Sequence, residues 1–267
     1  YNMALGLLDE LFTDPQADPQ AFDNLVRGIR KQRVNNKTNQ KIILSRLADY
    51  AIWGAKSVAT NVLSDKELDD LTPGELIQCI KQLGQYEYKI LYYGPQTDPE
   101  FLTSINDLRK TVTKFNPVPV PVEFIQQETE ANKIFFVQYS APQVQFSMLT
   151  KGPDRFDREL VPVIRMYNEY FGEGKTAVVF QEMREARGLA YSVGARYSLP
   201  SEPGLGYYFS ANITTQNDKM NDAIKVFGEI IDNMPESETA FELAKDGLIN
   251  NLRTRRILRA DVLWHYL

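Results

Sequence analysis

The chain has 267 residues, of which 43% are apolar and 24% charged, and its formal net charge is −5. This balance is typical of a globular protein, and the net negative charge argues against a nucleic-acid partner, since phosphate binding requires clustered lysine and arginine. A single cysteine, Cys79, excludes an intramolecular disulfide, and no apolar run approaches the roughly 18 residues of a membrane span. Cys79 lies among apolar residues at helical spacing, so we expect a buried thiol.

The first part of the chain is predicted to be mainly helical. Apolar residues at helical spacing start almost at the first residue, and Asp14 and Pro15 end that helix. A threonine cap at Thr72 with Glu75 three residues later predicts another helix start. The helix that starts there covers about 73–83, and further helical patterns cover about 19–34, 39–53 and 99–112. Alternating and aromatic residues over 86–93 predict one strand, which Gly94 and Pro95 end.

A proline-rich connector separates this part from the next. Residues 116–121 read Asn-Pro-Val-Pro-Val-Pro, and alternating prolines fit neither a helix nor a central strand. We therefore predict a first domain over 1–115, a linker over 116–131 and a second domain over 132–267. Both ends of the chain fall inside helical patterns, so both domains are expected to be partial, cut from a longer protein.

The second part mixes strands and helices. Strands are predicted over about 133–139, 144–150, 189–199 and 206–215. Helices are predicted over about 158–170, 176–186, 218–233 and 238–256. This order predicts an α+β fold in which the helices pack on one face of an antiparallel or mixed sheet.

The residues of this chain argue against two kinds of site, a phosphate-binding loop and a catalytic zinc site. The run from Gly172 to Thr176 invites a phosphate-loop interpretation, but Glu169 occupies the position of the first glycine, and a helix rather than a strand leads in. Catalytic zinc needs three protein ligands, usually including two histidines one helical turn apart. His265 is the only histidine, so we expect no metal site in this chain.

The segment from Tyr170 to Ser192 carries the most specific signal. Its sequence is Tyr-Phe-Gly-Glu-Gly-Lys-Thr-Ala-Val-Val-Phe-Gln-Glu-Met-Arg-Glu-Ala-Arg-Gly-Leu-Ala-Tyr-Ser. A glycine-rich turn thus leads into a helix that ends in Arg-Glu-Ala-Arg-Gly-Leu-Ala-Tyr, followed by a strand. This segment resembles the signature of the C-terminal, non-zinc-binding region of insulinase/pitrilysin-type metallopeptidases.

The resemblance implies a substrate-binding role. In that family an N-terminal domain carries an inverted zinc motif, and a C-terminal domain closes over the peptide with an arginine and a tyrosine seven residues apart. Arg184 and Tyr191 have this spacing. A guanidinium can hold peptide carbonyls, and a phenol can donate a hydrogen bond to an oxyanion. Gly172, Gly174 and Gly188 are the expected supporting hinge.

The same resemblance implies the partners and the compartment. The partners are a peptide substrate and a zinc-bearing domain of the parent protein or of another subunit, with the zinc outside this fragment. In a bacterium, family members imply a periplasmic or envelope location, although no residue of this chain indicates one. Isolated, the fragment is expected to be inactive.

One alternative remains open. The chain could be an inactive scaffold or assembly module of the same fold, with Arg184 paired to an acidic neighbour and Tyr191 filling the sheet face. For Arg187 and Glu182 we expect surface pairing, and for Tyr207, Tyr208 and Phe209 a place in the core or lining a cleft.

Overall fold

The computed structural model describes residues 2–108, 114–200, 204–258 and 261–265. The chain divides into two compact units that interleave along the sequence. Unit 1 comprises Tyr1–Asn35, Val62–Glu123 and Arg256–Leu267, and unit 2 comprises Asn36–Asn61 and Phe124–Arg255. The predicted division into 1–115, 116–131 and 132–267 stays a prediction.

Unit 1 consists of helices with local stop and start signals. Its helices are α1 (Asn2–Thr13), most of α2 (Pro19–Lys37), α4 (Asp65–Asp70), α5 (Pro73–Leu83), α6 (Asp98–Leu108) and α11 (Asp261–His265). The predicted cap of α5 is confirmed, since Thr72 and Glu75 form a reciprocal capping box. The last residues of the helix predicted over 99–112 lie outside the described residues.

The strand predicted over 86–93 is wrong. Within that range only Tyr86 takes part in a β-bridge, a parallel one with Asn116. The remaining residues are extended without a ladder. An alternating pattern predicts a strand only if a second strand is there to accept its backbone hydrogen bonds, and none among the described residues does so here.

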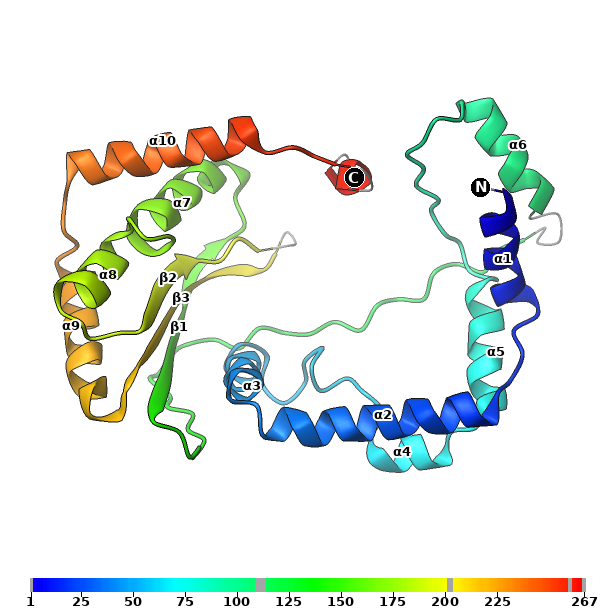
Figure 1. Cartoon of the computed structure of the whole chain (residues 1–267), viewed down its shortest axis with the longest axis horizontal. Coiled ribbons are helices and arrows are strands. Elements are labelled where there is room, and N and C mark those ends of the chain that lie inside the picture. Colours follow the sequence, from blue (N-terminus) through cyan, green and yellow to red (C-terminus); the bar gives the residue numbers. More distant parts are fainter. Residues whose placement is uncertain (1, 109–113, 201–203, 259–260, 266–267) are drawn as a thin grey trace. The chain divides into compact units, whose positions relative to one another are not determined.

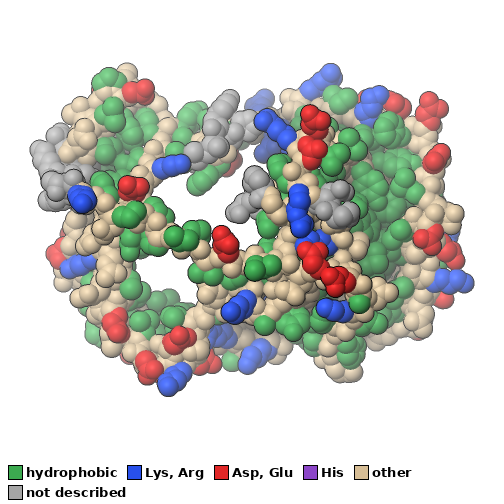
Figure 2. Space-filling model, turned by 180° about the vertical axis from the view of Figure 1, so that it is seen from behind, with side chains coloured by type: hydrophobic (Ala, Val, Ile, Leu, Met, Phe, Trp, Pro, Cys, Tyr) green, Lys and Arg blue, Asp and Glu red, His purple; other side chains and the backbone are tan. Residues whose placement is uncertain are grey.

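Cys79 corrects another expectation, because it is exposed. Helix α5 has no buried residue among those described, so its apolar stripe does not enclose a thiol. Several large apolar side chains of unit 1 are exposed as well, and Figure 2 shows such side chains at the surface.

Unit 2 begins with helix α3 (Gln40–Trp53). Asn39 caps it by accepting from the backbone N–H groups of Lys41 and Ile42, and Gly54 follows with a φ of +73°. These are the predicted boundaries. The extended segment that starts near Phe124 is tied to this helix by Gln127, whose N–H donates to the carbonyl of Ile52.

A three-stranded antiparallel sheet forms the centre of unit 2. Its strands are β1 (Gln143–Arg155), β2 (Ser192–Tyr197) and β3 (Gly206–Gln216), in the order β1-β3-β2. Ala211 of β3 lies opposite Met148 of β1 and Ala195 of β2. The other strand predicted here, over 133–139, is wrong. These residues run beside α3 instead, where the ring of Phe135 packs edge-on against Tyr50 and the hydroxyl of Tyr139 donates to the carbonyl of Thr38.

The helices that follow β1 in unit 2 cover one face of this sheet, as Figure 1 shows. They are η1 (Arg158–Leu160), α7 (Val161–Tyr167), η2 (Asn168–Gly172), α8 (Val178–Phe180), η3 (Gln181–Ala186), η4 (Asn217–Lys219), α9 (Met220–Asp232) and α10 (Glu238–Thr254). The first three run on without a break over the helix predicted at 158–170.

Alternate residues of β3 point into this layer and form the core with the helices. The buried apolar cluster comprises Tyr170, Phe171, Val178, Val179, Met183, Ala190, Ala195, Phe209, Ala211, Ile213, Ala223, Phe227, Ile230 and Ala244. The α+β prediction, with helices on one face of an antiparallel sheet, is confirmed.

Candidate functional site

Gly172 is the point where helix and sheet approach most closely. A Cβ atom added to Gly172 would lie 1.6 Å from the carbonyl oxygen of Ala195 in β2. No other residue fits such an approach of two backbones. Asn168, one turn earlier, holds the same strand, because its side chain donates to the carbonyl of Tyr197 and accepts from its N–H. The π-helical turn η2 is thereby fixed against β2.

The short loop after η2 places a second π-helical turn. Gly174 has a φ of +93°, a conformation that glycine adopts without steric cost. Ala177, Val179 and Met183 are each 0% exposed and anchor the inner side of α8 and η3 in the core. Single π-helical turns occur often at functional sites, and η3 carries Arg184.

Gly188 ends η3 with a left-handed C-cap of the αL type. Its φ is +57°, its N–H donates to the carbonyl of Arg184, and the N–H of Leu189 donates to the carbonyl of Met183. This pair of bonds satisfies carbonyls that the helix end leaves free. The chain then turns into β2, where the hydroxyl of Thr215 donates to the carbonyl of Leu189 at 2.6 Å.

Arg184 lies on the outer side of η3. Its side chain is 49% exposed, and its guanidinium carbon stands 5.0 Å from the ring centre of Phe180, a cation–π distance. The nearest carboxylate is Glu185, with 3.8 Å between Nε and Oε1. A surface pair at that distance contributes little, and half of the Arg184 side chain remains exposed.

Tyr191 follows Gly188 by three residues and is 50% exposed. Its N–H donates to the carbonyl of Thr214, which fixes its backbone to β3. Its phenol oxygen accepts a hydrogen bond of 2.8 Å from the side chain of Gln216. Because the phenol accepts this bond, its own proton can be donated to a second partner.

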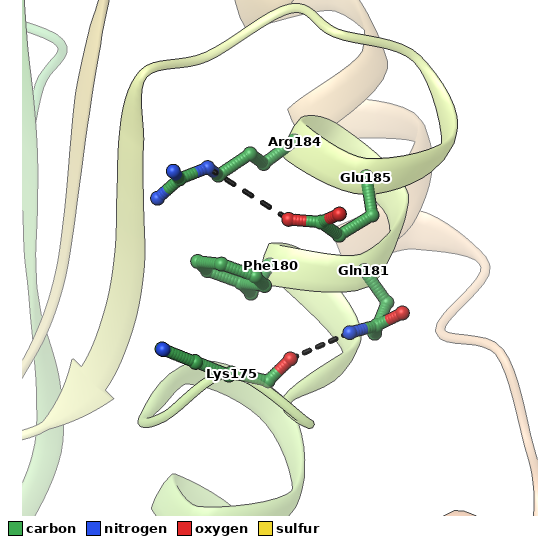
Figure 3. A pocket seen from close by; sticks show the side chains of 5 residues that line it. All are labelled: Lys175, Phe180, Gln181, Arg184 and Glu185. Atoms are coloured by element: carbon green, nitrogen blue, oxygen red, sulfur yellow. Dashed lines mark hydrogen bonds and ion pairs between the residues drawn. The ribbon is translucent and has the colours of Figure 1, made fainter.

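An open depression of about 380 Å³ lies beside Arg184. Figure 3 shows its lining side chains, which come from the loop after Gly174 and from α8 and η3. They are Lys175, Phe180, Gln181, Arg184 and Glu185. The side-chain amide of Gln181 donates to the carbonyl of Lys175 at 2.6 Å and so holds the loop against the helix.

Arg184 was predicted from the sequence, but the other four lining residues were not. A helical signal for two of them exists in the sequence, since Phe180 and Gln181 precede Arg184 and Glu185 by four positions and so share their faces. Lys175 had no such signal, because its place depends on the backbone turn at Gly174.

The other predicted side chains lie where expected. Arg187 pairs with Glu182 at 3.4 Å, and with Glu229 of α9 at 3.8 Å, which confirms surface pairing. Tyr207, Tyr208 and Phe209 are 2%, 6% and 6% exposed, which confirms a place in the packed interior.

The buried phenols of Tyr207 and Tyr208 differ in their surroundings. The hydroxyl of Tyr207 accepts from the N–H of Asp157 and donates to its carbonyl. Burial, together with the negative charge of Glu128, raises the pKa of Tyr208 to about 12, so this phenol stays protonated at neutral pH.

The described residues do not fit a zinc ion. Within 2–108, 114–200, 204–258 and 261–265, no group of three or more histidine, cysteine, aspartate or glutamate side chains is placed to hold a metal. His265 ends helix α11. None of the described helices combines the length and apolar character needed to cross a membrane.

Comparison with solved structures identifies the same fold in peptidases. The peptidase M16 inactive domain from Pseudomonas fluorescens superimposes with a TM-score of 0.65 at 19% identity, over 92% of this chain and 60% of that one. The ferredoxin protease FusC matches with a TM-score of 0.67 at 13% identity, over 95% of this chain and 28% of that one. The periplasmic protease PqqL from Escherichia coli gives 0.63 at 12% identity, over 92% and 27%.

The chain therefore spans 60% or less of the length of each of these three structures. Comparison with curated proteins by sequence finds no match. The family model named Peptidase M16 inactive domain, in contrast, matches residues 70–248, which is most of unit 2 and part of unit 1. The chain belongs to the M16 peptidase family and carries its inactive domain, a non-catalytic part of these proteins.

Proposed function

We propose that this chain forms a substrate-contacting wall of a zinc peptidase whose zinc and catalytic base lie in another domain or in a partner subunit. Its substrates are peptides or small proteins. Exposure of Arg184 and Tyr191 carries the proposal: a packed interior position for either side chain would exclude contact with a peptide, and both are about half exposed.

The segment between these two residues supports a shared role. The left-handed turn at Gly188 joins the end of η3 to the strand that follows, and both its hydrogen bonds and the burial of Met183 fix it. A preorganised arginine and phenol cost little reorganisation when charge develops on a substrate carbonyl. The guanidinium can hold peptide carbonyls, and the phenol can donate its free proton.

A peptide could be held in addition as an extra strand on a sheet edge. The outer edge of β2 is occupied in part, because Asn168 binds both backbone groups of Tyr197 and Gly172 abuts Ala195. Strand β1 is the other outer strand, and Thr129 binds the backbone of its residue Lys151. Nearer the start of β1, the side chain of Gln40 in α3 donates to the carbonyl of Gln143, so both outer edges are occupied in part, and an added strand would have to displace such contacts.

Hydrolysis of a fluorogenic peptide by the assembled peptidase tests the proposal. Removing one oxyanion donor typically costs about 10²- to 10³-fold in turnover, so Tyr191→Phe is expected to lower kcat by that order. Arg184→Ala is expected to raise KM, lower kcat, or both. Exposed residues away from the site supply matched controls, Tyr93→Phe and Arg165→Ala.

Circular dichroism and the melting temperature establish that each variant folds. If both Arg184→Ala and Tyr191→Phe turn over peptide like the wild type, the substrate-contact role is refuted. The scaffold alternative, in which the same fold only supports assembly, would then hold.

A further inference from the structure

The depression beside Arg184 contains two cationic side chains and an aromatic ring. Figure 3 shows Lys175, Phe180 and Arg184 projecting toward the same side, with the phenyl ring between the ammonium and guanidinium groups. Phe180 is partly buried, whereas Lys175 and Arg184 are exposed. A ring flanked by two cations offers an apolar platform and two hydrogen-bond donors for a single acidic side chain.

The two cationic side chains of this depression differ in their contacts with other residues. Arg184 faces Glu185 at 3.8 Å, a weak pair, and is held over Phe180. The ammonium of Lys175 makes no hydrogen bond or ion pair with any described residue. With Glu185 counted, the five lining residues still carry one net positive charge. An uncompensated lysine beside a half-open ring favours an anionic ligand group.

The backbone around Lys175 is fixed. Gly174 sets its direction with a φ of +93°, Gln181 holds its carbonyl at 2.6 Å, and Ala177 anchors the loop at 0% exposure. An ammonium on such an anchored backbone loses less conformational freedom on binding than one on a free loop.

We infer that this depression is a subsite for the acidic side chain of a bound peptide, with glutamate favoured over its neutral isostere glutamine. The methylene groups of a glutamate would pack on Phe180, and its carboxylate would lie between Lys175 and Arg184. This inference rests on the proposed function, since it assumes that a peptide passes Arg184. It adds Lys175 as the residue that sets the preference for acidic sequences.

Binding of labelled peptides to the 267-residue chain, followed by fluorescence anisotropy, tests the subsite without requiring hydrolysis. A set of peptide pairs is used in which each pair differs only by Glu or Gln at one position. An ion pair between exposed side chains is worth roughly 1.4-fold to fivefold in Kd, so at one position the glutamate peptide is expected to bind tighter by that factor. The preference is expected to shrink as salt is raised.

Variants then assign the preference to Lys175. Lys175→Gln is expected to bring the Glu/Gln ratio close to one, and Lys175→Glu to favour a lysine at the same peptide position. Lys225→Gln makes the same charge change on the exposed surface of α9, at a side chain with no bond to a described residue, and is expected to leave the ratio unaltered.

Each other outcome overturns the subsite. Equal affinities for glutamate and glutamine peptides at every position, a ratio that survives Lys175→Gln, an equal loss in Lys225→Gln, or no binding of any peptide would each do so. The proposed function is judged separately by peptide turnover of Arg184→Ala and Tyr191→Phe in the assembled peptidase. If the peptidase depends on those two residues but shows no preference for glutamate, the subsite is refuted and the proposed function stands.

Discussion

The two units stabilise their helices by different means. In unit 2, fourteen apolar residues from the sheet and the helices form one buried cluster. In unit 1, Leu68 is the sole buried side chain among those that the structure describes, and apolar residues of α1 such as Leu7 and Leu11 are 58% and 61% exposed. The described helices of unit 1 therefore bury far less apolar surface than the sheet and helices of unit 2.

Unit 1 relies instead on local bonds at its helix starts. Ser64 and Glu67 form a capping box at α4, Thr72 and Glu75 form one at α5, and the side chain of Glu100 accepts from Thr97 before α6. Salt bridges from Arg30 to Asp69 and from Arg33 to Asp65 add pairs between α2 and α4. The capping boxes act within one turn of each helix, whereas the two salt bridges join different helices.

Removing one large side chain from each unit gives the sharpest contrast. Phe171→Ala empties a position that is 1% exposed and is expected to cost about 3–5 kcal/mol of unfolding free energy. Leu11→Ala, at 61% exposure, is expected to change it by less than about 0.5 kcal/mol. Urea unfolding followed by circular dichroism measures both. Similar losses in the two variants would show that the helices of unit 1 share a buried core after all.

Two glycines of unit 2 test whether close approach or helix propensity dominates there. Gly172→Ala forces a methyl group onto the carbonyl of Ala195 and is expected to cost roughly 1–3 kcal/mol. Gly228→Ala, within α9 and with no atom within 4 Å of the added Cβ, is expected to stabilise by about 0.5–1 kcal/mol. Thermal unfolding compares them. A neutral Gly172→Ala would mean that η2 can move away from β2 without loss.

Acid should act on the capped helices of unit 1. Hydrogen bonds from Ser64, Thr72 and Thr97 lower the pKa values of Glu67, Glu75 and Glu100 below the ordinary 4.5. A lowered pKa in the folded state gives stabilisation that is complete above pH 4.5 and is lost as the pH falls through the folded-state pKa values. Amide hydrogen exchange in α4, α5 and α6 is therefore expected to accelerate below that pH, after correction for the intrinsic rate.

Glu75→Gln provides the control for this small effect. Glutamine can replace glutamate in a capping box but does not titrate, so α5 is expected to lose its pH dependence while α4 and α6 retain theirs. Unchanged protection of all three helices in acid would show that the caps contribute nothing measurable.

How far the sequence predicts the structure depends on the range of the interaction. The helix start at Thr72 was predicted because a cap involves residues within one turn. The strands predicted at 86–93 and 133–139 failed, since alternation specifies a strand only together with a distant partner. The π-helical form of η2 and η3 has no sequence signal, because it results from the packing of Gly172 on β2 and of Met183 in the core.

The candidate site divides in the same way. Arg184 and Tyr191 were placed by a local motif, and the turn at Gly188 that joins them is likewise local. The depression beside Arg184 was not foreseen, since Lys175 reaches it through a left-handed turn and a bond from Gln181.

In the segment from Ala177 to Arg184, the residues that pack in the core and the residues that line the depression lie on opposite sides of the backbone. Ala177, Val179 and Met183 face inward, whereas Phe180 and Arg184 face solvent. The outward positions can therefore be substituted without changing the inward residues that form the core. Such an arrangement suits laboratory evolution, in which a randomised outer face could be screened for new peptide preferences while the melting temperature stays nearly constant.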